Sequence, residues 1–275
     1  MWFAEQPLLR VALLEDHLVI ARPRARGASG GAPLQVLDLA APTAGAPMWQ
    51  PAMDALATWL REQGLQRAHL HVYLSAHFVR WQLLEWQPRL TQPQELDAYV
   101  QLRFRATFGA PAEQWRVVHA EPQPGRVLPS CAIDEALIAA LQELQTIGHS
   151  RVVHATPYFS AAFDRWRSRL DRQAAWFGAA EPGSLTLGLL HRGVWRGLRA
   201  ARHHGQGDAG WRSVLPALQA QIGLASGLDL QPAPPLFLAG CGAAPGGRAE
   251  PGLVWLQPEG GREPAQGLAR MAWGV

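Results

Sequence analysis

Apolar residues recur along the chain with two spacings, which predict strands and helices. Leu9–Ala21, LRVALLEDHLVIA, contains two apolar runs suited to strands on either side of a polar turn at Glu15–Asp16–His17. A third strand is predicted at Leu34–Leu39, and alternating patterns predict two more at Ala68–Ser75 and His77–Trp86. We expect the first stretch to begin the folded domain.

Apolar positions three and four residues apart predict helices between these strands. Pro47–Gly64 carries such a stripe and ends at a glycine, and Thr91–Phe108 has a proline near its start. Two more helices are predicted at Ile133–Ile147 and Pro157–Leu170. Short strands are expected around them at Trp115–Glu121, Arg126–Ala132 and Val152–Ala155.

The second half of the sequence repeats the order of strands, helix and strand. Three strands are predicted at Ala174–Gly178, Ser184–Leu190 and Gly193–Ala200, followed by a helix at Trp211–Gly223 and a buried strand at Pro235–Ala239. The remaining predicted elements are a strand at Gly252–Gln257 and a short helix at Pro264–Trp273. The repeated order predicts an α/β fold in two related halves.

The composition of the chain excludes several kinds of chemistry and indicates its compartment. The 275 residues are 48% hydrophobic and 17% charged, which is typical of a globular protein. All 25 basic residues are arginine, so chemistry that needs a Schiff-base lysine or a P-loop lysine is excluded. No apolar window is long enough to span a bilayer, the N-terminus lacks a secretory signal, and two cysteines make no disulfide framework; we expect a cytoplasmic protein.

Three polar features could carry chemistry, and each has a simpler explanation. His69 and His71 share one face of a strand, where two imidazoles can bind zinc, but no third or fourth ligand is identifiable. Asp16 beside His17 could serve in acid–base catalysis, but no nucleophile is placed with them. The basic stretch at residues 22–26 is short for a nucleic-acid or lipid contact. We therefore expect no metal and no nucleic-acid partner.

Four stretches together resemble a known family. Glu95–Glu121 and Asp134–Asp164 resemble segments of PilM-type type IV pilus assembly proteins. LFLAGCGA at Leu236–Ala243 resembles the strand and glycine pair beside adenosine in actin-like ATPases, and AQGLARMA at Ala265–Ala272 is similar to the closing helix. The cytoplasmic domain of the type II secretion L protein shares this actin-like fold.

The resemblance implies a fold and a domain organisation. It implies a two-lobed, actin-like α/β fold, duplicated in the ribonuclease H-like manner, with mixed sheets flanked by helices. Residues 1–170 would form the first lobe, with an inserted subdomain at about 76–131. Residues 171–275 would form the second lobe, with its closing helix at about 264–273.

The chain departs from the nucleotide-binding motifs of the family. ATP-binding members need an Asp-x-Gly turn, and the first turn here has Asp16 but no glycine. The second turn, placed at Thr186–Leu187–Gly188–Leu189, keeps a glycine but no acid. Gly240 and Gly242 remain as the adenosine-side pair. We therefore expect a non-catalytic protein without a cofactor, the alternative being an actin-like ATP-binding protein or ATPase.

The resemblance also implies a role and a partner. We expect a scaffold of a type IV pilus or type II secretion assembly, held at the inner membrane through a partner and lacking a membrane span of its own. It would bind the cytoplasmic tail of that partner in a groove between subdomains, with self-association as a further contact. Candidate partner-binding residues from the inserted subdomain are Phe78, Arg80 and Trp81.

Overall fold

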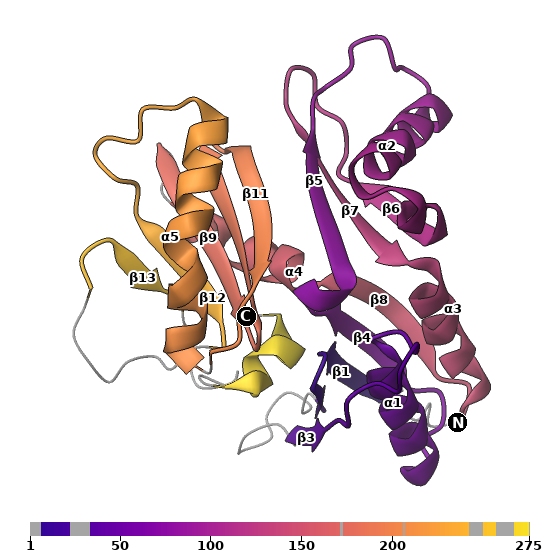
Figure 1. Ribbon diagram of the computed structural model, residues 1–275. Helices are drawn as coiled ribbons and strands as arrows, with labels where there is room; N and C mark the ends of the chain where they lie inside the picture. The colour runs from indigo at the N-terminus through magenta and orange to yellow at the C-terminus, as the bar shows by residue number, and fades with distance from the viewer. Residues whose placement is uncertain are drawn as a thin grey trace, which may run out of the picture.

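Two five-stranded sheets with the same internal order form the frame of the protein (Figure 1). The computed structural model describes residues 7–22, 34–170, 173–205, 207–241, 250–256 and 267–274. In each sheet, three strands consecutive in sequence form an antiparallel meander, and two later strands add to it in parallel. This repetition confirms the duplicated α/β fold that the sequence predicts.

The first sheet has the order β3-β2-β1-β4-β8. Its meander comprises β1 (Leu8–Leu13), β2 (His17–Ala21) and β3 (Leu34–Asp38). The parallel strands β4 (His69–Leu74) and β8 (Arg151–Pro157) follow beside β1. The opening hairpin is therefore confirmed, with β1 paired to both β2 and β4 at the centre of the sheet.

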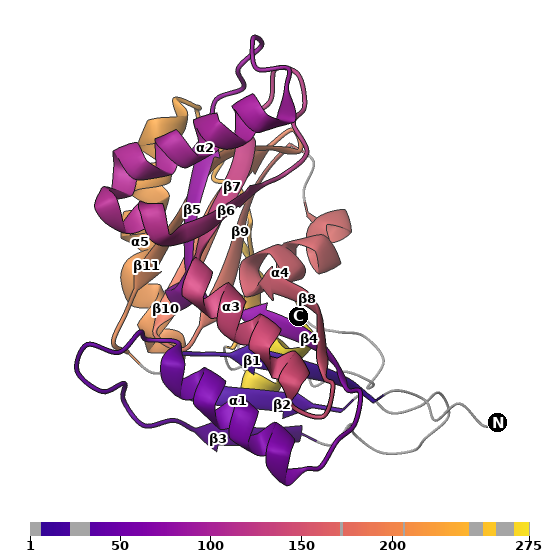
Figure 2. The same cartoon turned by 90° about the vertical axis from the view of Figure 1, so that its right-hand side faces the viewer.

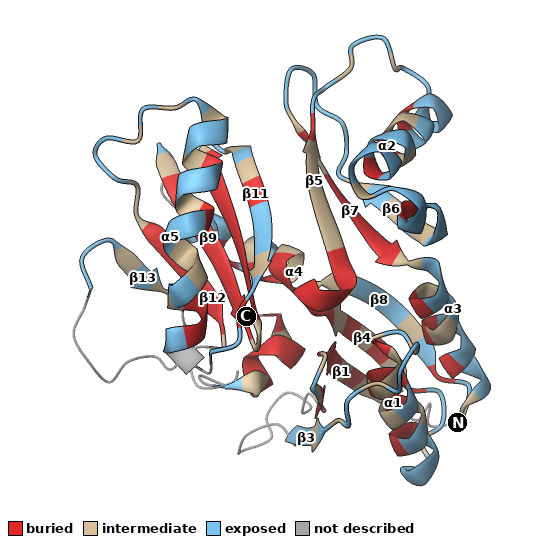
Figure 3. Ribbon diagram, viewed as in Figure 1, coloured by how far each residue is buried: buried red, intermediate tan, exposed pale blue. Residues whose placement is uncertain are grey.

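The second sheet has the order β11-β10-β9-β12-β13. Its meander comprises β9 (Ala174–Glu181), β10 (Ser184–His191) and β11 (Val194–Arg202). β12 (Leu236–Gly240) pairs in parallel with β9, and β13 (Leu253–Trp255) pairs in parallel with β12. β9 is buried along almost its whole length, whereas β11 at the edge has one buried residue and is otherwise half-buried or exposed (Figure 3).

A small third sheet lies beside the second one (Figure 1). It is antiparallel, with the order β5-β7-β6, and comprises β5 (Val79–Leu84), β6 (Trp115–His119) and β7 (Leu128–Asp134). Helix α2 (Pro93–Phe108) covers one face of this sheet through the apolar stripe that the sequence predicts. We propose that this unit is the inserted subdomain, and that the two large sheets are the two lobes.

Helices cover the outer faces of the two large sheets. α1 (Gln50–Glu62) and α3 (Glu135–Glu143) pack side by side on the first sheet (Figure 2), and α5 (Gly207–Ser226) packs on the second. The apolar stripe predicted for α1 is the face that packs on the sheet, because Met53, Leu56 and Leu60 lie on one side of the helix and are all buried. None of the described helices has the length and apolar character needed to cross a bilayer.

A central apolar layer joins the inner faces of the two large sheets. It contains α4 (Tyr158–Trp166) and the closing segment η5 (Leu268–Trp273), with side chains from both sheets packed around them. The closing segment is a short 3-10 helix and reaches the first sheet, where the Arg10 guanidinium lies 4.6 Å from the Trp273 ring centroid. The predicted closing helix begins at Pro264, and residues 264–266 lie outside the described part of the chain.

Candidate functional site

The duplication brings two equivalent turns together between the large sheets. The β1–β2 turn contains Glu15 and Asp16, and the β9–β10 turn contains Pro182 and Gly183. His77, which follows β4, contacts both turns, because its ring lies beside Glu15 and against the Gly183 backbone. The resemblance implies that the β1–β2 turn would correspond to the phosphate turn of ATP-binding members.

A buried carboxylate crosses between the sheets at this point. Glu181, the last residue of β9, is only 2% exposed. The Ser75 hydroxyl donates a hydrogen bond of 2.6 Å to Glu181 Oε2, and the Ala76 backbone N–H donates to the same oxygen at 3.0 Å. These hydrogen bonds connect the end of β9 to the residues that follow β4, and so link the two halves.

His77 extends the link to the first turn. Its Nδ1 lies 3.0 Å from Ser75 Oγ, and its Nε2 lies 3.1 Å from Glu15 Oε2. The residues Glu15, His77, Ser75 and Glu181 thus form one hydrogen-bonded chain, which we name the polar junction. Ser75 and His77 resemble a nucleophile and base, but Ser75 is 0% exposed and donates its hydrogen to Glu181. The polar junction is therefore built to hold the halves together.

Burial sets the protonation of the polar junction. It raises the pKa of Glu181 to about 7, although the hydrogen bonds from Ser75 and Ala76 oppose the shift. Burial also lowers the pKa of His77, with the Glu15 carboxylate opposing that change. Both shifts favour the neutral form of a group enclosed between the sheets, so the polar junction is sensitive to pH near neutrality.

The sequence-based position of the second turn is wrong. Thr186–Leu189 lies within β10, because it continues the buried apolar strand. Gly188 is required there by packing, since a Cβ atom would overlap the Trp195 ring. The β9–β10 turn is Pro182–Gly183, and the sequence-based prediction does not include the acid that precedes it, Glu181. The signal was present in the sequence, because Pro-Gly between two apolar runs marks a turn.

The predicted nucleotide-site residues have structural explanations. Asp16 Oδ1 lies 2.7 Å from His17 Nδ1, and its side chain is 56% exposed. Gly240 ends β12 with φ +106°, and a Cβ atom there would overlap the Ala180 carbonyl oxygen of β9. Gly242 lies outside the described residues. Asp16 is therefore explained as a turn residue, and Gly240 is explained by the close contact between β12 and β9.

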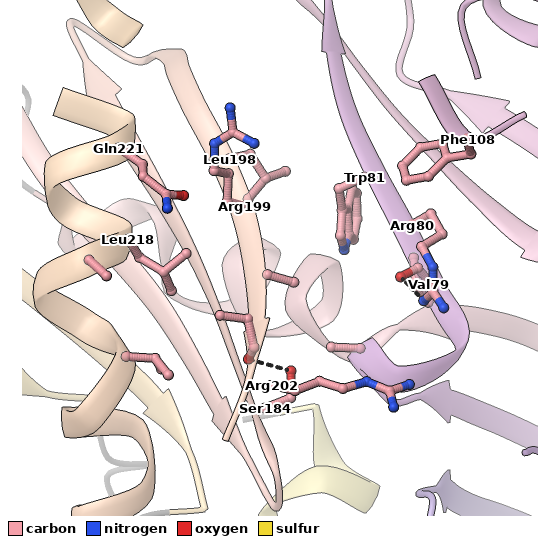
Figure 4. Close-up of a pocket in the computed structure, with 15 residues that line it drawn as sticks. Val79, Arg80, Trp81, Phe108, Ser184, Leu198, Arg199, Arg202, Leu218 and Gln221 are labelled. Atoms are coloured by element: carbon pink, nitrogen blue, oxygen red, sulfur yellow. Dashed lines mark hydrogen bonds between the residues drawn. The ribbon is translucent and has the colours of Figure 1, made fainter. Parts of the chain in front are cut away.

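A groove of about 430 Å³ opens beside the polar junction (Figure 4). One wall consists of β5 residues with Phe108 from α2, and the other consists of β11 residues with α5. Its lining residues are Ala76, Val79, Arg80, Trp81, Phe108, Ser184, Leu198, Arg199, Ala200, Ala201, Arg202, Val214, Ala217, Leu218 and Gln221. The groove therefore combines segments more than a hundred residues apart in sequence.

Both strands that flank the groove are edge strands. β5 is the outer strand of the small sheet, and β11 is the outer strand of the second large sheet. The two strands lie opposite each other (Figure 1), and residues of both line the groove. Within the described part of the chain, neither edge pairs with a further strand. An edge strand presents unpaired backbone donors and acceptors, which favour the addition of an extended segment.

The groove lining is cationic. It contains Arg80, Arg199 and Arg202, and its fifteen lining residues include no aspartate or glutamate. Arg80 Nη1 donates to the His77 and Val79 carbonyl oxygens, both at 3.1 Å. Burial, together with the nearby Arg202 charge, lowers the pKa of Arg80. Positive charge is thus concentrated where the lining supplies no opposite charge.

The three predicted partner-binding residues separate in the structure. Arg80 and Trp81 line the groove, and Trp81 projects from β5 toward the opposite wall (Figure 4). Phe78 is 7% exposed and packs in the core of the first sheet. Sequence reasoning missed β11 and α5 as the second wall, because no local pattern shows that this edge strand would face β5.

Solved structures share this fold. The cytoplasmic domain of EpsL, an inner-membrane component of the Vibrio cholerae type II secretion system, aligns with a TM-score of 0.56 at 12% identity, covering 97% of this chain and 92% of that one. A structure of the PilM–PilN type IV pilus biogenesis complex aligns at 0.57 and 15% identity, covering 91% and 88%. No protein-family model and no curated protein sequence matches this chain.

A third structure makes the fold explicit. A Bacteroides thetaiotaomicron protein with an actin-like ATPase fold and unknown function aligns at a TM-score of 0.56 and 11% identity, covering 98% of this chain and 95% of that one. These likenesses confirm the predicted actin-like fold, with mixed sheets flanked by helices. Because the sequences are only 11–15% identical, the likeness establishes the architecture alone. The function has to be inferred from the site.

Replacing Glu181 with glutamine tests the polar junction. The wild-type carboxyl, whose pKa is raised from 4.5 to about 7, stabilises the fold most below pH 4.5, and that contribution is lost as pH rises through 7. The wild type should therefore lose up to about 3 kcal/mol of unfolding free energy relative to Glu181→Gln between about pH 5 and pH 8. Urea denaturation across this range measures the difference, with the exposed Glu62→Gln as control. A constant difference would refute the buried titration.

Substituting Gly240 tests whether strand packing requires this glycine. Gly240→Ala places a Cβ atom against the Ala180 carbonyl oxygen and imposes an unfavourable φ, so we expect a loss of about 1–3 kcal/mol of stability. Gly223→Ala in α5 meets only ordinary contact with Leu230 and should be neutral or stabilising. Thermal and urea unfolding compare the two variants. Equal stability of both would contradict the packing role.

Proposed function

We propose that this chain is a non-catalytic cytoplasmic scaffold of a type IV pilus or type II secretion assembly. It binds a cytoplasmic segment of an inner-membrane partner and is held at the membrane through that partner. The proposal is supported by the fold shared with the EpsL cytoplasmic domain and with the PilM–PilN complex. The observation that carries it is the groove between the edge strands β5 and β11.

The groove suits an extended peptide better than a compact ligand. A peptide that adds to a sheet edge gains main-chain hydrogen bonds from the edge and specificity from pockets on either side. Here the apolar part of the lining includes Trp81, Leu198 and Leu218, and the polar part is arginine-rich. A tail emerging from a membrane protein is a segment of this kind, since it can remain extended until it binds.

The polar junction favours this proposal over the ATPase alternative. Ser75 and Ala76 both bond directly to Glu181 at the end of β9, and His77 contacts Glu15 and Gly183, so protein groups already bridge the two turns. The β1–β2 turn lacks the glycine that lets backbone approach a phosphate. Gly240, the described member of the adenosine-side pair, is explained by contact with Ala180. We infer that this position holds the two halves in a fixed relation.

A pull-down tests partner binding. The full chain should retain a cytoplasmic tail from a panel of inner-membrane pilus and secretion proteins, and Ala217→Trp should abolish retention by filling the groove. Ala217 is exposed on α5 and lines the groove, whereas Ala220 is exposed on the same helix outside it. Ala220→Trp is therefore the matched control. Failure to retain any tail would refute the partner proposal, and equal retention by both variants would refute the groove as the binding site.

A thermal shift experiment tests the ATPase alternative. A ligand that binds the folded state raises the melting temperature, by an amount that grows with its concentration relative to Kd. We expect millimolar Mg–ATP to leave the melting temperature unchanged, because the polar junction occupies the position between the turns. A saturable rise with Mg–ATP that is absent with Mg²⁺ alone would favour the nucleotide-binding alternative.

A further inference from the structure

We propose that the bound segment is an acidic strand that pairs with the free edge of β11 and places a carboxylate between Arg80 and Arg202. This inference rests on the proposed function, because it takes the same groove and specifies the chemistry of its occupant. Three features support it: the two faces of β11, the composition of each groove wall and the charge at the groove floor.

The two faces of β11 point to different surroundings. On one face, a Cβ atom at Gly197 would meet Ile222 of α5, and Ala201 packs in the cluster that contains α5. On the other face, Leu198 packs in the central layer between the sheets. Side chains alternate along a strand, so a segment added to β11 directs alternate residues toward α5 and toward β5.

The α5 side of the groove is suited to apolar side chains. Val214, Ala217 and Leu218 line it, with Gln221 at one position. Val214 is half-buried and Leu218 is buried, so a bound side chain completes a partly formed apolar surface here. Every second residue of the added strand should accordingly be apolar, because covering this surface removes nonpolar area from water.

The β5 side is suited to a carboxylate. Arg202 extends across the floor of the groove beneath Arg80 (Figure 4). Arg202 Nη2 contacts the Met48 sulfur at 3.4 Å, a weak acceptor, and Arg80 Nη1 is bonded to backbone carbonyls. Neither arginine has an ion-pair partner among the described residues. A carboxylate between them relieves the repulsion and forms charge-assisted hydrogen bonds in a partly buried setting.

The edge strand distinguishes a peptide from a small anion. A free phosphate could pair with the arginines, but it leaves the β11 backbone and the apolar α5 side uncovered. An acidic strand uses all three features at once. The occupant therefore requires both a carboxylate and a peptide backbone, and each requirement can be removed separately in an experiment.

Selection from a phage-displayed library identifies the chemistry of the occupant directly. Random linear peptides of about twelve residues, long enough to cover an edge strand, are selected on the full chain. We expect enriched peptides to carry aspartate or glutamate among alternating apolar residues. Enrichment of peptides without acidic residues would overturn the proposal.

Fluorescence anisotropy with a selected peptide then tests each requirement. Changing its acidic residue to the corresponding amide, or methylating alternate backbone nitrogens, should each weaken binding about tenfold or more. Arg202→Gln should weaken it similarly, with unchanged melting temperature. Arg196→Gln is the matched control, since Arg196 is exposed on β11 but does not line the groove. Tight binding by the amide peptide, or by Arg202→Gln, would refute the ion pair.

The outcomes separate this inference from the proposed function. If a membrane-protein tail is retained but is insensitive to Arg202→Gln, the acidic-strand inference fails and the scaffold proposal stands. If selected acidic peptides bind through Arg202 but no tail is retained, the scaffold proposal fails and the acidic-strand inference stands. Binding insensitive to backbone methylation and displaced by inorganic phosphate would identify a small-anion site and overturn the strand.

Discussion

The carboxylate of Glu181 lies between two sheets that meet mainly through the central apolar layer. Its hydrogen bonds to Ser75 and Ala76 fix the end of β9 against the end of β4. Apolar contacts are not directional, so the central layer alone would permit the halves to slide. The directed hydrogen bonds of Glu181 fix the position of one half relative to the other. His77 connects them to the first turn through its contacts with Ser75 and Glu15.

The groove depends on this fixed relation. β5 begins just after Ser75–His77, and Ser184, three residues after Glu181, pairs with Arg202 at the end of β11, so the polar junction lies at the base of both walls. The polar junction, a few residues from each strand, therefore sets the distance between the edges β5 and β11. The duplicated actin-like frame thus uses the position between the turns for structure and leaves the opening beside it available for binding.

Most of the fold could be predicted from the sequence because its signals are local. The opening hairpin, the stripe of α1 and the stripe of α2 each follow from periodicity within one segment. The second turn was misplaced because Gly188, a packing glycine, was interpreted as a turn residue. Of the proposed contact residues, Arg80 and Trp81 reach the groove and Phe78 does not, since exposure along β5 depends on what packs against each face.

Hydrogen–deuterium exchange on the complex with a retained tail tests the central claim most directly, because it locates the bound segment on the chain without assuming its chemistry. If the tail occupies the groove, exchange slows along β11, Val194–Arg202, and along the facing strand β5, with little change at Leu236–Gly240. Protection centred on Leu236–Gly240 and the β1–β2 turn, with β11 unchanged, would contradict this and place binding at the nucleotide position of the actin-like fold.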